Sequence, residues 1–156
     1  MHLRCRRIGS ALFASLSVLI ASPPAGADDW LGVRGGYYFD QHRPFLGAES
    51  LTQVGHWPLF FNPNVEYVFT RNRKHITVNM DFEYESPRWR RTFLFAGFGP
   101  ALVYDNPHGP IEPDVDIVSQ VSGGVGREWR SIVPYLRGKV ILQHDREAVL
   151  ALGLRF

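Results

Sequence analysis

The stretch His75-Ile76-Thr77-Val78-Asn79-Met80-Asp81-Phe82-Glu83-Tyr84-Glu85 alternates between polar and apolar residues without a break. Its even-numbered positions are apolar or aromatic, and its odd-numbered positions are polar or charged. Successive side chains of a β-strand point to opposite sides, so a period of two indicates a strand with two different faces. A helix would mix the two sets of side chains on one surface. This stretch therefore predicts a strand.

The same alternation recurs along the chain on both sides of this stretch. The run from Leu59 to Phe69 shows it, and the polar segment Thr70-Arg71-Asn72-Arg73-Lys74 separates the two runs as a hairpin turn would. Continuing outward, the pattern predicts eight strands, at residues 29–39, 45–54, 59–70, 75–85, 91–104, 114–127, 132–143 and 148–156. Pro63, Pro100 and Pro134 fall inside these strands, so each implies a bulge, an unpaired position or a misplaced boundary. The fold class is all-β, an eight-stranded antiparallel up-and-down barrel.

The first 27 residues have the organisation of a secretory signal peptide. Arg4, Arg6 and Arg7 precede an apolar run from Ile8 to Ala21, and Ala25-Gly26-Ala27 has the small residues that a signal peptidase recognises. The apolar run is about 14 residues long, short of the ~20 that a membrane-spanning helix needs. We therefore expect cleavage before Asp28, with residues 1–27 as the signal peptide and residues 28–156 as a single barrel domain.

Removing the signal peptide changes the charge and the cysteine content. The signal peptide holds three of the 17 basic residues, which leaves 14 against 15 acidic residues in the mature chain. A nearly neutral chain gives no electrostatic case for a nucleic-acid partner. The single cysteine, Cys5, is also removed, so we expect the exported protein to have no disulfide.

Charged residues on the polar faces suggest which face of the barrel points inward. Eight strands enclose a lumen narrow enough for side chains to fill, and opposite charges could neutralise one another there. We expect an interior charge network that closes the lumen, formed by Arg34, Glu66, Asp81, Glu83, Arg137 and Lys139. The apolar faces would then meet lipid, and aromatic residues near the strand ends would form girdles at the two membrane interfaces. These aromatic residues are Trp30, Tyr37, Phe39, Trp57, Phe69, Tyr84, Trp89, Tyr104 and Trp129.

Three segments give the chain a resemblance to a known family. They are PYLRGKV at residues 134–140, LGLRF at residues 152–156 and FAGFGP at residues 95–100. With them, the chain resembles the small bacterial outer-membrane β-barrel family of the OmpA, OmpX and OmpW kind. The resemblance implies a transmembrane barrel in the outer membrane, contact with outer-membrane lipid and lipopolysaccharide, and recognition of the terminal Phe156 by the barrel-assembly machinery. The connections are mostly shorter than the loops of family members with known binding roles.

An amino terminus in the periplasm would place four connections together at the outer end, near residues 40–44, 70–74, 105–113 and 144–147. One histidine accompanies each connection, with carboxylates nearby, and this combination of ligands suits zinc or copper. The resulting hypothesis is a rim metal site formed by His42, His75, His108 and His144. The alternative is that these are ordinary solvated loop residues. Arg71, Arg73 and Lys74 could likewise contact lipopolysaccharide phosphates, or simply form a solvated turn.

Three classes of function remain open. The first is a non-enzymatic outer-membrane barrel with a structural, small-ligand-binding or surface-binding role. The second is a soluble periplasmic lipocalin-like carrier, and the third is an enzyme that modifies lipid A. We favour the first class, because His144-Asp145 has no serine near it in sequence and no catalytic triad is evident. Gly123-Gly124-Val125-Gly126 does not match a phosphate loop, so we expect these glycines to relieve crowding or to curve a strand. The sequence indicates no cofactor and identifies no protein partner.

Overall fold

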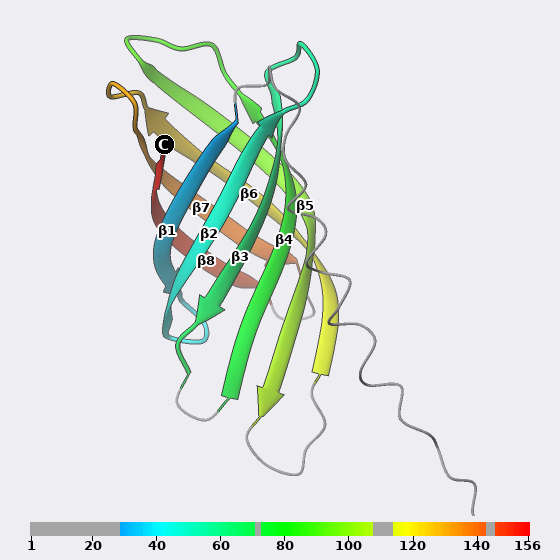
Figure 1. Cartoon of the computed structure of the whole chain (residues 1–156). Coiled ribbons are helices and arrows are strands. Elements are labelled where there is room, and N and C mark those ends of the chain that lie inside the picture. The colour runs from blue at the N-terminus through cyan, green and yellow to red at the C-terminus, as the bar shows by residue number, and fades with distance from the viewer. Residues whose placement is uncertain (1–28, 71–72, 108–113, 143–145) are drawn as a thin grey trace, which may run out of the picture.

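The computed structural model describes residues 29–70, 73–107, 114–142 and 146–156. Eight strands form a closed barrel, in which each strand pairs antiparallel with the next and β8 pairs with β1 (Figure 1). The strands are β1 (Trp30–Tyr38), β2 (Arg43–Gln53), β3 (Leu59–Val68), β4 (Arg73–Glu85), β5 (Thr92–Pro107), β6 (Asp114–Arg127), β7 (Val133–Leu142) and β8 (Glu147–Arg155). The predicted eight-stranded antiparallel barrel is confirmed, and the predicted signal peptide lies outside the described residues.

The two ends of the barrel differ in their connections. At the end that we call the turn end, the connections 54–58, 86–91 and 128–132 join β2 to β3, β4 to β5 and β6 to β7. At the opposite end, the loop end, lie the strand ends that the other four connections join. Leu31 and Phe156 close the barrel at the turn end through two backbone hydrogen bonds of 3.1 and 2.8 Å. No helix of the described residues is long and apolar enough to cross a membrane.

The three prolines inside strands are accommodated without bulges. The β2–β3 ladder loses its pairing opposite Pro63, between the pairs Glu49↔Asn64 and Thr52↔Phe61. The β4–β5 ladder is interrupted in the same way opposite Pro100. The register is unchanged on both sides of each gap, so no residue is inserted. Pro134 lies just beyond the last β6–β7 pair. Of the three explanations predicted for these prolines, the unpaired position applies to Pro63 and Pro100.

The strands place charged side chains inside the barrel and apolar side chains outside it. Asp81 and Glu83 are 1% and 0% exposed, whereas their neighbour Phe82 is 38% exposed. Leu152 of β8 is 67% exposed. Most of the predicted girdle residues also lie on the outside, but Trp30 does not. Trp30 has the same parity as Arg34 in β1, so it faces the lumen, where it packs against an aromatic cluster.

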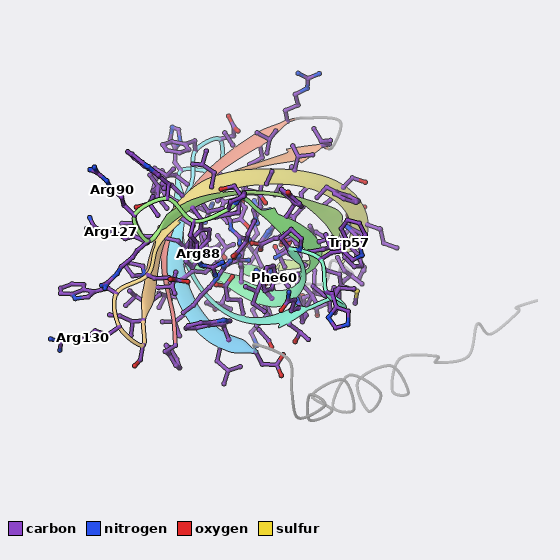
Figure 2. All side chains as sticks on the ribbon, turned by 90° about the horizontal axis from the view of Figure 1, so that it is seen from above. Trp57, Phe60, Arg88, Arg90, Arg127 and Arg130 are labelled. Carbon is purple, nitrogen blue, oxygen red and sulfur yellow. The ribbon has the colours of Figure 1, made fainter. Side chains whose placement is uncertain are left out.

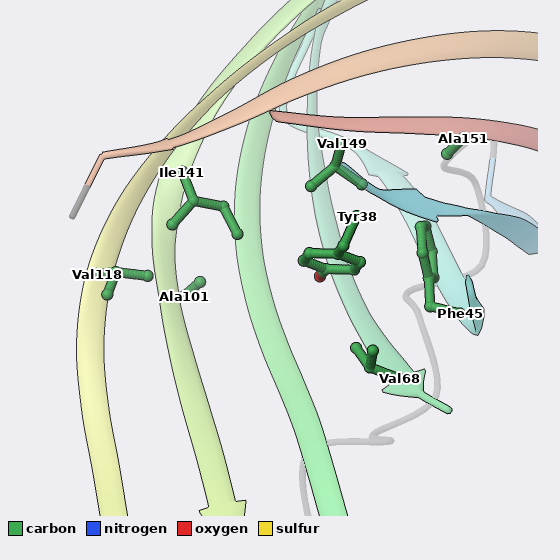
Figure 3. Close-up of a cluster of buried hydrophobic side chains, with 8 residues drawn as sticks. All are labelled: Tyr38, Phe45, Val68, Ala101, Val118, Ile141, Val149 and Ala151. Carbon is green, nitrogen blue, oxygen red and sulfur yellow. The ribbon is translucent and has the colours of Figure 1, made fainter. Parts of the chain in front are cut away.

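Two apolar clusters occupy the lumen, one near each end. Figure 3 shows the cluster toward the loop end, which consists of Tyr38, Phe45, Val68, Ala101, Val118, Ile141, Val149 and Ala151. Toward the turn end, Phe93, Phe95, Val133 and Tyr135 form the second cluster. A Cβ atom at Gly124 would lie 2.4 Å from the Phe95 ring, and one at Gly126 would lie 2.5 Å from the Phe93 ring. These glycines therefore make room for aromatic rings, as the sequence predicted.

Candidate functional site

A layer of buried charged side chains fills the barrel between the two apolar clusters. Among the described residues, this layer contains four cations and four carboxylates, each no more than 4% exposed. We call it the lumen network: Arg34, Arg137, Lys139, Arg155, Glu49, Glu66, Asp81 and Glu83. These eight charges balance one another, and a fifth buried carboxylate, Glu85, borders the layer at the turn end and pairs with both Arg155 and Arg88. All six residues predicted for an interior charge network are part of the lumen network.

Glu66 of β3 organises one side of the lumen network. Its carboxylate lies 2.7 Å from Nη2 of Arg34 and 2.8 Å from Nζ of Lys139. The hydroxyl of Tyr38 donates a hydrogen bond to the same carboxylate. One buried acid therefore ties together β1, β3 and β7, and the tyrosine connects the network to the apolar cluster near the loop end.

Glu49 and Glu83 organise the other side, where they share two arginines. Arg155 lies 3.0 Å from Glu49 through Nε and 3.0 Å from Glu83 through Nη2. Arg137 pairs closely with Glu83, and its Nη2 lies 3.9 Å from Glu49. Asn62 donates from Nδ2 to both carboxylates. The two acids would repel each other if left alone, and the shared donors offset that repulsion.

Amide side chains complete the hydrogen bonding of Asp81. Gln120 of β6 donates to Oδ1 of Asp81 at 2.6 Å, and Asn64 donates to Oδ2 at 3.1 Å. Asn79 in turn donates to Asn64 Oδ1 at 2.5 Å. A buried carboxylate is tolerated when its oxygens are hydrogen-bonded and balanced by charge. The amides supply this bonding, since the guanidinium of Arg137 lies 3.8 Å from Oδ2 of Asp81.

Aromatic rings cover the arginines on the turn-end side of the network. The guanidinium of Arg155 lies 4.7 Å from the ring centre of Tyr135, and that of Arg137 lies 5.0 Å from the ring centre of Phe95. Such contacts stabilise a cation in a site with little water. Every strand of the barrel therefore contributes at least one side chain to the lumen network or its contacts.

Two members of the network, Glu49 and Arg155, were not predicted from the sequence. Glu49 lies in the segment Leu46-Gly47-Ala48-Glu49-Ser50-Leu51, which alternates poorly, so the sequence does not indicate which face Glu49 occupies. Arg155 had a usable signal, because Leu150, Leu152 and Leu154 form one apolar face of the last strand by their alternation. Arg155 therefore had to lie on the opposite, inward face, and its position next to the chain end obscured this.

The two described residues of the hypothetical metal site, His42 and His75, have different contacts. His75 is buried at the loop end, where its Nδ1 lies 3.7 Å from Oδ2 of Asp105. His42 lies in the turn after β1, with its ring nitrogen against the carbonyl of Phe39. His108 and His144 lie outside the described residues. Within the described part of the chain, no group of three or more histidine, cysteine or acidic residues has an arrangement that suits a metal ion.

A recess of about 510 Å³ opens into the barrel at the turn end. Its lining includes Trp30, Phe60, Glu85, Arg88 and Arg155. Arg155 belongs to the lumen network and lies 3.2 Å from Glu85, so the network lies at the inner side of this recess. Figure 2 views the barrel from this end, with Phe60 and Arg88 near the middle of the opening.

Comparison with known proteins identifies the type of barrel. No protein-family model and no curated protein matches the chain. Among solved structures, it is similar to Neisserial surface protein A (NspA), with a TM-score of 0.67 and 12% identity over 83% of this chain and 97% of that one. The N-terminal β-barrel domain of Pseudomonas aeruginosa OprF gives a TM-score of 0.63 and 12% identity over 82% and 96% of the two chains. The fold is that of a small outer-membrane β-barrel.

A third structure of this type is Ail, the attachment invasion locus protein of Yersinia pestis. It matches the barrel with a TM-score of 0.58 and 9% identity over 83% of this chain and 97% of that one. The OmpA-like architecture expected from the sequence is thereby confirmed. At these identities, the likeness establishes the fold of the barrel and leaves its role to be argued from its own residues.

Proposed function

We propose that this chain is a non-enzymatic protein of the bacterial outer membrane, exported through a cleaved signal peptide. Its barrel has a structural or surface-binding role, and its lumen network closes the barrel to passage. The observation that carries the proposal is the inverted distribution of side chains, with charge inside the barrel and apolar residues outside it.

The outward apolar surface favours a lipid environment over a soluble carrier. Large apolar side chains are exposed on all eight strands, and together they exceed the scattered apolar residues normal on soluble proteins. A lipocalin-like carrier would need the opposite arrangement, because its ligand lies against apolar side chains in the lumen. Here charged side chains occupy the middle of the lumen.

The proposed closure of the lumen is supported by the buried lumen network and the two apolar clusters on either side of it. An eight-stranded barrel has an interior that side chains can fill. The charges of the network are buried and paired with one another, so ion flow would require breaking these contacts.

Several features support a role without catalysis. Among the residues that the structure describes, no hydrogen bond joins a serine to a histidine, and such a bond is the central part of a hydrolytic triad. The names of NspA, a surface protein, and Ail, an attachment protein, agree with a surface-binding role.

The proposed partners meet different parts of the barrel surface. We call the outward-facing apolar side chains of the eight strands the apolar belt. Outer-membrane lipid would cover the belt, and lipopolysaccharide phosphates would meet the exposed Arg73 and Lys74 at the loop end. The barrel-assembly machinery would recognise Phe156, whose ring is exposed beside the outward-facing Leu154.

Cell fractionation with a gel assay tests the proposal. We expect the protein in the outer-membrane fraction, resistant to extraction by salt, and migrating differently on gels when it is not heated. A known periplasmic protein released from the same cells is the control. Recovery of the chain with that soluble control would contradict the proposal and favour a carrier. Changed lipid A acyl chains in expressing cells, measured by mass spectrometry, would instead favour the enzyme.

A further inference from the structure

Two neighbouring turns at the turn end share the same construction. In each, a tryptophan and the residue three positions later exchange backbone hydrogen bonds: Trp89 with Thr92 at 2.8 and 2.9 Å, and Trp129 with Ile132 at 2.8 and 3.1 Å. Glu128 N donates to Arg91 O at 2.8 Å, so the two turns lie side by side. The tips of the turns are Arg90-Arg91 and Arg130-Ser131.

The arginines at these tips occupy backbone conformations that arginine rarely adopts. The φ angles of Arg90, Arg91 and Arg130 are 50°, 69° and 58°. Two-residue hairpin turns favour glycine, asparagine or aspartate in this left-handed region. Local stability alone would therefore select other residues at these positions, and strained residues of this kind often mark functional sites.

These arginines also lack acidic partners. We call Arg90, Arg91, Arg127 and Arg130 the arginine rim; all four are exposed. The nearby carboxylates of Glu85 and Glu128 both pair with Arg88. Within the described part of the chain, no carboxylate forms an ion pair with a residue of the arginine rim. Figure 2 shows Arg90, Arg127 and Arg130 projecting from one side of the barrel, away from Trp57.

Exposed indole rings flank the arginine rim and connect it to the apolar belt. Trp89 is 74% exposed and Trp129 is 63% exposed. Leu94 and Leu136, a few residues further along β5 and β7, are exposed members of the belt. Tryptophan favours the interface between the hydrocarbon and the headgroups, so in a membrane the arginines next to it would lie at the depth of lipid phosphates.

We infer that the arginine rim binds the phosphate of anionic phospholipids in the leaflet at the turn end. Guanidinium groups form bidentate hydrogen bonds with phosphate, and the unpaired charge of the rim adds long-range attraction. The third turn, 54–58, carries Trp57 without an arginine, so the site occupies one side of the barrel. This inference depends on the proposed location in a membrane, and it goes beyond that proposal by naming the lipid class and its site.

Native mass spectrometry of the folded, full-length mature protein in detergent tests the inference. Phosphatidylglycerol and phosphatidylcholine are added separately, and the retained lipid is counted. The test variant is Arg90→Asn with Arg91→Gly, which places favoured residues in the turn and should fold as well as the original. The matched control is Arg43→Gln with Arg146→Gln, which removes two charges at the loop end. The gel shift of unheated samples verifies folding of each protein.

We expect the original protein and the control to retain phosphatidylglycerol in preference to phosphatidylcholine. The test variant should lose at least about tenfold in apparent affinity for phosphatidylglycerol. Equal retention of the two lipids by the original protein would overturn the inference, and so would unchanged retention by the test variant or an equal loss in the control. Retention of inorganic phosphate as strong as that of the lipid would also overturn it. All these results leave the outer-membrane location intact, because fractionation tests that location separately.

Discussion

Arg137 shows at the scale of a single residue how a charge is held inside this barrel. Its guanidinium pairs with Glu83, approaches Asp81 and Glu49, and stacks near the rings of Phe95 and Tyr135. Its burial has a desolvation cost that these contacts offset. Removing the arginine would leave Glu83 buried with fewer partners, which is less stable than replacing both charges.

Arg137→Met is therefore expected to lower the free energy of unfolding by about 3 to 5 kcal/mol. Urea titration of the barrel folded in lipid vesicles measures this change. Arg127→Met on the exposed rim is the control and should stay within about 0.5 kcal/mol of the original protein. Adding Glu83→Gln to Arg137→Met should restore part of the loss. Equal stabilities of the two single variants would mean that the interior pairing is unimportant.

At the scale of the element, the alternation of apolar and polar residues gives each strand one face toward the outside of the barrel and one toward the lumen. β8 presents Leu150, Leu152 and Leu154 outward and Ala151 and Arg155 inward. Leu152 pairs with Gly35 of β1 and Leu136 of β7, in the middle of both ladders. A side chain at this position would lie near the middle of the membrane.

Leu152→Arg is expected to destabilise the barrel in vesicles by about 2 to 4 kcal/mol, because a charge on the lipid face loses its hydration there. Trp57→Arg, at the edge of the belt, is the control and should cost about 0 to 1 kcal/mol. The measurement is the same urea titration in vesicles. If both substitutions had equally small effects, the outer face would not be in contact with the hydrocarbon.

At the scale of the whole molecule, the lumen is organised in layers. An apolar cluster lies toward the loop end, the lumen network lies in the middle, and a second, mainly aromatic cluster lies toward the turn end. Side chains from all eight strands meet in this interior, so barrel closure and lumen filling depend on each other.

We expect the barrel to insert into planar bilayers without producing stepwise ion conductance. The reason is that the buried ion pairs of the lumen network would have to separate before an ion could pass. Insertion is verified by the gel shift of protein recovered from vesicles of the same lipid, and protein-free bilayers provide the baseline. Reproducible current steps would show that the lumen is open.

The sequence by itself determined the number of strands, their antiparallel order and the face of most of them. These properties follow from local alternation, and the narrow interior of an eight-stranded barrel made an ionic filling predictable. Glu49 was the main member of the lumen network that the sequence did not predict. The alternation of β2 is weak around Gly47 and Ala48, so it does not indicate which side chains point inward.

Only the tertiary structure decided which charges pair and where the arginine rim lies. Arg155 and Glu49 are 106 positions apart in the chain, and they meet because closure of β8 onto β1 brings them to the same level of the lumen. The turns that carry Arg90 and Arg130 likewise become neighbours through the pairing of β5 with β6. Local patterns specify the direction of a side chain, but its partners depend on register across the closed sheet, which long-range pairing sets.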